Sequence, residues 1–86
     1  MDNTYNCKLT DRGFERIPFA DADGQMCSLQ VCSAIDPRVW FGVETNREGE
    51  AVFNRALLDK DMCRQLIKHL QLFIDKDTID LDNRFR

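Results

Sequence analysis

The sequence predicts an α+β fold, with an antiparallel sheet of three to four strands and one C-terminal helix packed on one face of the sheet. Two observations predict this class. Short runs of β-branched and aromatic residues, separated by turn residues, extend to about residue 57. A single apolar pattern with helical spacing follows, from about residue 60 to residue 75. Strands that precede a helix, instead of alternating with helices, are typical of an α+β domain.

Length and composition predict one domain over residues 1–86. Chains of this length rarely divide their core. The hydrophobic share of 43% and the charged share of 31% are close to those of globular proteins. Residues 1–12 and 77–86 are expected to be loose or to form edge strands, because their apolar residues are sparse.

The first predicted hairpin joins a strand around Ile17 to a strand at residues 26–32. Asp23 and Gly24 lie between these two runs, and Gly24 tolerates the positive φ of a tight turn. Residues 26–32 show the two-residue period of a half-buried strand. Pro18 has no amide hydrogen to donate, so its strand is expected at an edge or near a strand end.

The next two predicted strands cover residues 39–43 and 51–57. Asp36 and Pro37 indicate a turn before the first of them, whose residues are rich in β-branched and aromatic side chains. The polar residues 44–50 are expected to connect the two strands. The second run is less regular, and the sequence leaves open whether it forms a strand.

A helix is predicted from Lys60 to Asp75. Asp59 is a typical N-cap, because its carboxylate can accept hydrogen bonds from the amides of the first turn, and Asp61 complements the positive end of the helix dipole. The helix carries a broad apolar stripe that must pack against something. This stripe comprises Met62, Cys63, Leu66, Ile67, Leu70, Phe73 and Ile74.

The charge balance argues against recognition of phosphate groups. The formal net charge is -3 and the isoelectric point is near 5.0, whereas affinity for nucleic acid depends on clustered Lys and Arg. No apolar run approaches the length that spans a bilayer, and residues 1–6 show no signal-peptide pattern. We therefore expect a cytoplasmic protein without membrane contact, whose four cysteines are free thiols.

Trp40 is the leading candidate for contact with a protein partner. If Phe41 faces a core beneath the helix, strand alternation sends Trp40 to the opposite face of the sheet. An exposed Trp is typical of binding hot spots. The alternative is that the N-terminal segment, through Tyr5 or Leu9, covers Trp40 within the monomer.

The full set of predicted partner-binding residues is Trp40, Phe41, Leu72 and Phe85. Leu72 lies away from the apolar stripe of the predicted helix, and Phe85 in the tail has no evident neighbour. Large apolar residues without a place in a small domain indicate a protein partner or a homodimer. No cofactor is expected.

Two other functions are alternatives to protein binding. A small nucleic-acid-binding module would use Lys8, Arg12, Arg16 and Arg38, if the fold gathers them on one face.

A thiol-dependent or metal-dependent enzyme would use Cys27, Cys63 and His69. The spacing of these residues does not match the paired ligands of structural zinc sites. No neighbouring residue in the sequence would lower the pKa of a nucleophilic cysteine. We therefore expect neither a catalytic residue nor a metal site.

Residues 19–30, Phe-Ala-Asp-Ala-Asp-Gly-Gln-Met-Cys-Ser-Leu-Gln, resemble a group of small uncharacterised proteins encoded by phages, prophages and other mobile elements. In that group an Asp-containing turn with Gly leads into Cys-Ser-Leu-Gln. A Trp-x-Gly strand follows, and a C-terminal amphipathic helix begins after a Leu and a capping residue. Residues 40–42 and 58–59 match these last two motifs, so the resemblance covers residues 17–75. This chain is shorter after Gly42 and has Asp, not Thr or Ser, at the capping position.

The resemblance implies a context and no catalytic residue. It implies an accessory protein of a mobile element, and such proteins commonly occlude a host machine, including the nucleases of bacterial defence, as anti-CRISPR proteins do. We therefore expect a non-enzymatic binding protein that modulates or inhibits a host protein complex. Nucleic acid is not the expected partner.

Overall fold

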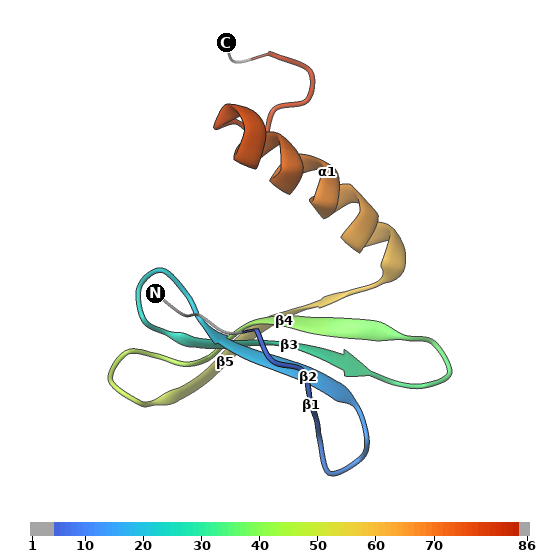
Figure 1. Cartoon of the computed structure of the whole chain (residues 1–86), viewed down its shortest axis with the longest axis vertical. Coiled ribbons are helices and arrows are strands. Elements are labelled where there is room, and N and C mark those ends of the chain that lie inside the picture. The colour runs from blue at the N-terminus through green and yellow to red at the C-terminus, as the bar shows by residue number, and fades with distance from the viewer. Residues whose placement is uncertain (1–4, 85–86) are drawn as a thin grey trace.

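The computed structural model describes residues 5–84, which form a five-stranded antiparallel sheet followed by one helix (Figure 1). Each strand pairs with the next one in the sequence. The α+β class is confirmed, and the sheet has five strands instead of the three or four predicted. The elements are β1 (Lys8–Leu9), β2 (Glu15–Ala20), β3 (Met26–Cys32), β4 (Arg38–Thr45), β5 (Ala51–Leu58) and α1 (Lys60–Lys76).

The additional strand is β1, in the segment that the sequence left as either loose chain or an edge strand. Lys8 pairs with Arg16 and Leu9 with Glu15, and the described pairing of β1 with β2 ends there. Pro18 lies beyond this pairing, opposite Ser28 of β3. The strand of Pro18 is not an edge strand, because β2 lies between β1 and β3. The described pairing with β1 ends at Arg16, so at Pro18 itself β2 pairs with β3 alone, and a missing amide hydrogen is tolerated there.

Two turns of similar construction join β2 to β3 and β4 to β5. In the first turn the Asp21 carboxylate accepts hydrogen bonds from the amides two and four residues later, at 2.9 and 2.8 Å. Gly24 in the same turn has a φ of 82°. In the second turn the side-chain oxygen of Asn46 accepts from the corresponding amides at 3.0 and 2.9 Å. The hairpin predicted from Asp and Gly is therefore confirmed.

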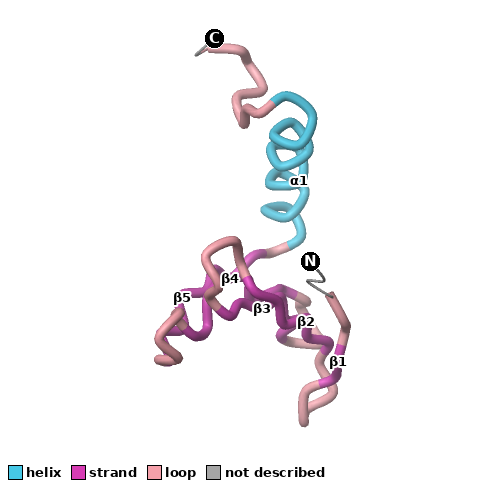
Figure 2. Tube along the Cα trace, turned by 60° about the vertical axis from the view of Figure 1, so that its left-hand side comes forward, coloured by secondary structure: helices cyan, strands magenta, loops and turns pink. Residues whose placement is uncertain are grey.

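The prediction that α1 packs on one face of the sheet is wrong. Figure 1 and Figure 2 show the helix leaving the end of β5 and projecting away from the sheet. The reason is the short connection: Asp59 alone links Leu58 to Lys60, and its backbone is extended, with a φ of −87° and a ψ of 178°. The chain has no turn in which to reverse, and α1 has no buried residue.

The two faces of the sheet differ in polarity. Cross-strand pairing places Trp40 beside Gln30 on one face and Phe41 beside Leu29 on the other. We call the first the polar face; it carries Lys8, Arg16, Pro18, Ser28, Gln30, Arg38, Trp40, Glu44, Arg55 and Leu57. We call the second the apolar face; it carries Ile17, Phe19, Leu29, Val31, Val39, Phe41, Val43 and Leu58.

Very little of the described chain is buried. Among residues 5–84 only Cys27 and Ser28 are buried, with exposed fractions of 5% and 0%. They are adjacent in β3 and point to opposite faces. The sheet is a single layer, and Phe41 on the apolar face is 44% exposed. In this same part of the chain, no helix has the length and apolar content needed to cross a membrane.

Candidate functional site

A charged network lies at the centre of the polar face, around Glu44 of β4. Arg16 of β2 donates from both terminal nitrogens to the Glu44 carboxylate, with Nη1 at 2.6 Å from Oε2. Ser28 of β3 donates to the same oxygen at 2.8 Å, and Arg55 of β5 donates to it at 3.2 Å. One carboxylate therefore connects side chains from four strands.

The network shields Glu44 and fixes both arginines. The Glu44 side chain is 13% exposed, and those of Arg16 and Arg55 are 28% and 22% exposed. The hydrogen bonds from Arg16 outweigh the effect of burial, and with the further hydrogen bond from Ser28 they hold the pKa of Glu44 below its ordinary value. The same hydrogen bonds raise the pKa of Arg16. Two guanidinium groups around one carboxylate leave the network with a positive charge.

Trp40 lies beside this network and is half-buried. The guanidinium carbon of Arg55 is 5.2 Å from the ring centroid of Trp40 and 5.3 Å from that of Phe53. Both distances allow a cation–π contact. Arg55 therefore contacts two aromatic rings while Glu44 holds the end of its side chain.

Phe53 belongs to a β-bulge. The register of β4 and β5 shifts between Val43 and Thr45, so that Val52 and Phe53 together stand opposite Glu44. Phe53 has a φ of 47°, which is uncommon for a residue with a side chain, and it is 59% exposed. The bulge thus holds an aromatic ring in solvent at a conformational cost.

Gly42 allows β5 to approach β4 closely at this site. Its φ is 150°, and a Cβ atom at this position would lie 2.4 Å from the carbonyl oxygen of Asn54 and 2.9 Å from the Cα atom of Arg55. Any larger residue would displace the backbone of β5. Gly42 therefore helps to position Arg55 over Trp40.

The structure separates the predicted partner-binding residues. Trp40 lies on the polar face and Phe41 on the apolar face. Leu72 is half-buried on α1, which projects away from the sheet. Phe85 lies outside the described residues. The three described residues therefore do not form one surface.

The N-terminal segment does not cover Trp40. Tyr5 packs against Phe19 with 5.4 Å between ring centroids, and Phe19 stacks on Phe41 at 6.0 Å. Tyr5 therefore lies at the apolar face, and it is Arg55 that shields Trp40. Sequence reasoning missed Arg55 and Phe53, because their placement depends on a bulge for which the sequence carries no clear signal.

Three of the four predicted nucleic-acid-binding residues share the polar face. Lys8 pairs with Arg16, and Arg38 lies two residues before Trp40 on β4. Arg12 lies in the turn between β1 and β2. Arg16 is bound within the network, and Arg38 forms an exposed ion pair with a neighbouring Asp at 3.0 Å. Fewer positive charges are therefore available to a phosphate than the sequence suggested.

The residues of the alternative thiol or metal site lie on different elements. Cys27 is in β3, and Cys63 and His69 are in α1. Burial raises the pKa of the Cys27 thiol, whereas a nucleophilic cysteine requires a lowered pKa. All four cysteines are free. In the described ranges, no group of three or more His, Cys, Asp or Glu is placed to hold a metal ion.

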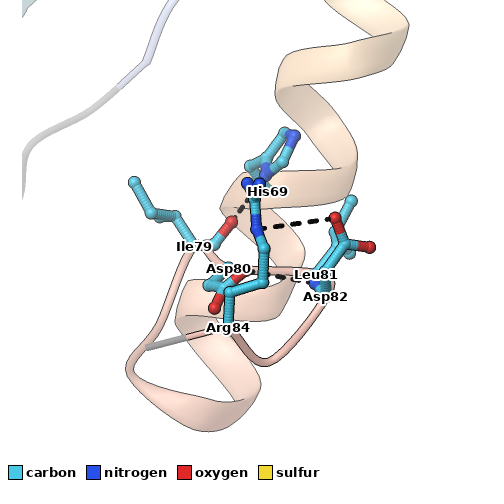
Figure 3. A pocket seen from close by; sticks show the side chains of 6 residues that line it. All are labelled: His69, Ile79, Asp80, Leu81, Asp82 and Arg84. Carbon is cyan, nitrogen blue, oxygen red and sulfur yellow. Dashed lines mark hydrogen bonds and ion pairs between the residues drawn. The ribbon is translucent and has the colours of Figure 1, made fainter. Parts of the chain in front are cut away.

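Residues 77–84, after α1, contain no strand. They fold back beside the end of the helix and form an open hollow with it (Figure 3). His69 donates from Nδ1 to the carbonyl oxygen of Ile79 at 2.6 Å. The Asp80 carboxylate accepts from the amide of Asp82 at 3.1 Å, and Arg84 pairs with Asp82 at 3.9 Å. The polar groups of the hollow thus hold the tail in place, so we do not assign the site to it. Its lining residues are His69, Ile79, Asp80, Leu81, Asp82 and Arg84.

Neither a protein-family model, nor a curated protein, nor a solved structure matches this chain. The fold and site define a five-stranded meander with an arginine and aromatic cluster on one face and a projecting amphipathic helix.

Proposed function

We propose that this chain is a non-enzymatic binding protein that acts on another protein through the polar face of its sheet. Trp40, Phe53 and Arg55 make the contact. Arg16 and Glu44 hold Arg55 in its place. We define these five residues as the binding cluster.

The observation that carries the proposal is the contact of one guanidinium group with two aromatic rings, at 5.2 and 5.3 Å. Trp and Arg are enriched among the few residues that contribute most of the energy of a protein interface. Arg55 is already fixed by Glu44, so binding would restrict its side chain little further. Phe53 is exposed at a strained backbone position, which supports a functional role for its ring.

The resemblance to proteins of phages and mobile elements supports a further part of the proposal. Accessory proteins of this kind act on host protein complexes, and defence nucleases are among their targets. We propose a target of this kind in the host cytoplasm. The binding cluster needs no bound cofactor for such a role.

The test is affinity capture from a bacterial lysate, with wild-type protein beside Trp40→Ala and Phe53→Ala. Both variants are expected to weaken binding of the true partner at least about tenfold, because hot-spot residues contribute more than about 1.4 kcal/mol each. Ile79→Ala is the matched control, since Ile79 is an exposed apolar residue of the tail. Circular dichroism verifies that each variant is folded. If both folded variants retain every strong interactor, the binding cluster is not the site.

Nucleic-acid binding is the second candidate, because Lys8, Arg16 and Arg38 share the face that carries Trp40. Salt separates the two functions. Binding to phosphates weakens steeply with salt concentration, whereas a contact centred on Trp40 and Phe53 changes little. Steep salt dependence together with a loss of binding in Lys8→Ala would favour the nucleic-acid function.

A further inference from the structure

The apolar stripe of α1 is exposed to solvent except at Cys63, in the first turn of the helix. Ile67 is 63% exposed, Phe73 54% and Ile74 72%. An isolated helix of 17 residues is marginally stable in water, and amphipathic helices in proteins gain most of their stability from packing of the apolar face. The stripe therefore requires a surface to cover it.

The apolar face of the sheet is the second surface that is largely exposed, with Tyr5 packed against Phe19 at one place on it. Leu29 and Phe41 at its centre are 36% and 44% exposed. At one corner Cys63, in the first turn of α1, lines a hollow together with Val39 and Leu58. The stripe of α1 therefore begins on the side of the apolar face and then continues beyond the sheet.

The size of the exposed surface indicates how much is missing. A folded monomer of this mass is expected to expose about 5,200 Å², whereas the chain exposes 6932 Å². Its radius of gyration is 14.9 Å, compared with about 12 Å for a compact domain of this length. Burying the excess in two chains would remove about 3,400 Å², which is within the range of permanent dimers.

We infer that two copies of this chain form a dimer by exchanging their helices, so that α1 of each copy packs across the apolar face of the other. The single linking residue, Asp59, keeps α1 from folding back over its own sheet. In a second copy the same two surfaces are largely exposed, and a twofold axis satisfies both reciprocally and closes the assembly.

The dimensions of the two surfaces agree. A helix of 17 residues is about 25 Å long, and strands of eight residues, such as β4 and β5, are about 26 Å long. One helix therefore spans one sheet. The exchange leaves the polar face free, so it does not depend on the proposed binding cluster.

The first test is the mass of the full chain in solution, measured by sedimentation equilibrium. Wild type is expected to have twice the chain mass of 10.0 kDa. Ile67→Glu in the stripe and Phe41→Glu on the apolar face should each reduce the mass to that of one chain. Lys68→Glu, next to Ile67 on the polar side of α1, and Trp40→Ala, next to Phe41 on the polar face, are the matched controls and should stay dimeric. A wild type with the mass of a single chain overturns the inference.

The second test distinguishes exchange from other dimers and does not require a disruptive substitution. A flexible insertion of about six residues between Leu58 and Asp59 lengthens the connection to that of a typical strand-to-helix loop. With this longer connection α1 can fold back and cover its own sheet. This variant is expected to be folded and monomeric. If it stays dimeric, or if Ile67→Glu dissociates the dimer while Phe41→Glu does not, the helices are not exchanged onto the sheets. The two proposals are tested separately: the effect of Trp40→Ala on partner capture reports on the binding cluster, and its mass in solution reports on the dimer.

Discussion

At the scale of single residues, Glu44 determines the polar face. Its carboxylate binds Arg16, Ser28 and Arg55, and without it two guanidinium groups would face each other in a partly buried place. The negative charge of Glu44 therefore stabilises the site in two ways: it accepts these hydrogen bonds, and it offsets the repulsion between the two guanidinium groups. It is also the group whose protonation would loosen the binding cluster.

The lowered pKa of Glu44 predicts an acid dependence of stability. A carboxyl whose pKa is lower in the folded chain stabilises the fold above its unfolded pKa, about 4.3, and this contribution is lost as the pH falls through the folded pKa. We expect Glu44→Gln to lower the free energy of unfolding by about 2 kcal/mol at neutral pH, because both arginines lose their anion. The variant should also lose this part of the acid dependence. Urea unfolding at a series of pH values measures both effects.

Glu48→Gln is the control for this measurement. Glu48 is exposed in the turn between β4 and β5, where its amide and not its carboxylate binds Asn46. Its stability curve should follow that of the wild type. If the Glu44→Gln curve also runs parallel to the wild type at all pH values, Glu44 does not have the role described.

The sequence predicted part of the site at this scale. Strand alternation correctly placed Trp40 and Phe41 on opposite faces, because adjacent side chains of a strand point to opposite sides of the sheet. Arg55 and Phe53 could not be placed in the same way. Their relation to Trp40 depends on the bulge and on the close approach at Gly42, and both are set by pairing between strands, not by local pattern.

At the scale of elements, the N-cap and length of α1 are set by the local sequence, whereas its direction is not. Its predicted N-cap is confirmed: the Asp59 carboxylate accepts from the amide of Met62 at 2.8 Å. Its predicted length is also close, since α1 ends at Lys76 and not at Asp75. Its direction was predicted wrongly. An apolar stripe shows only that a helix packs against some surface. The connection of one residue before α1 prevents that surface from being the sheet of the same chain.

Asp59→Ala should destabilise the fold by about 1 kcal/mol, because the first turn of α1 loses its side-chain acceptor. Asp59→Asn retains a capping oxygen and should be close to wild type. Chemical unfolding followed by far-ultraviolet circular dichroism compares the three proteins. Equal losses in both variants would mean that charge, and not capping geometry, is what Asp59 contributes.

At the scale of the whole molecule, the distribution of apolar surface decides how the fold is stabilised. A five-stranded single layer with two buried residues in its described part has almost no interior of its own. The prediction of one self-contained domain assumed that helix and sheet cover each other. The hydrophobic and charged shares of the sequence are typical of a globular protein, but they do not show whether the core lies within one chain or between two.

A core between two chains makes stability depend on concentration. The midpoint of thermal unfolding is expected to rise with the concentration of the wild-type protein, because dimerisation and folding are coupled. The variant with an extended link after Leu58 should show a constant midpoint. Differential scanning calorimetry over a wide range of concentrations tests this, and a constant midpoint for the wild type would contradict a shared core.

The single-layer sheet has a consequence for the number of binding surfaces that the proposed dimer would present. Each sheet of the pair would give one side to its sister chain and present the opposite side, with Trp40 and Arg55, outward. The assembly would then be bivalent. A target with repeated subunits would be bound with the gain of avidity that a raised effective concentration provides, and two separate target molecules would be tethered to each other.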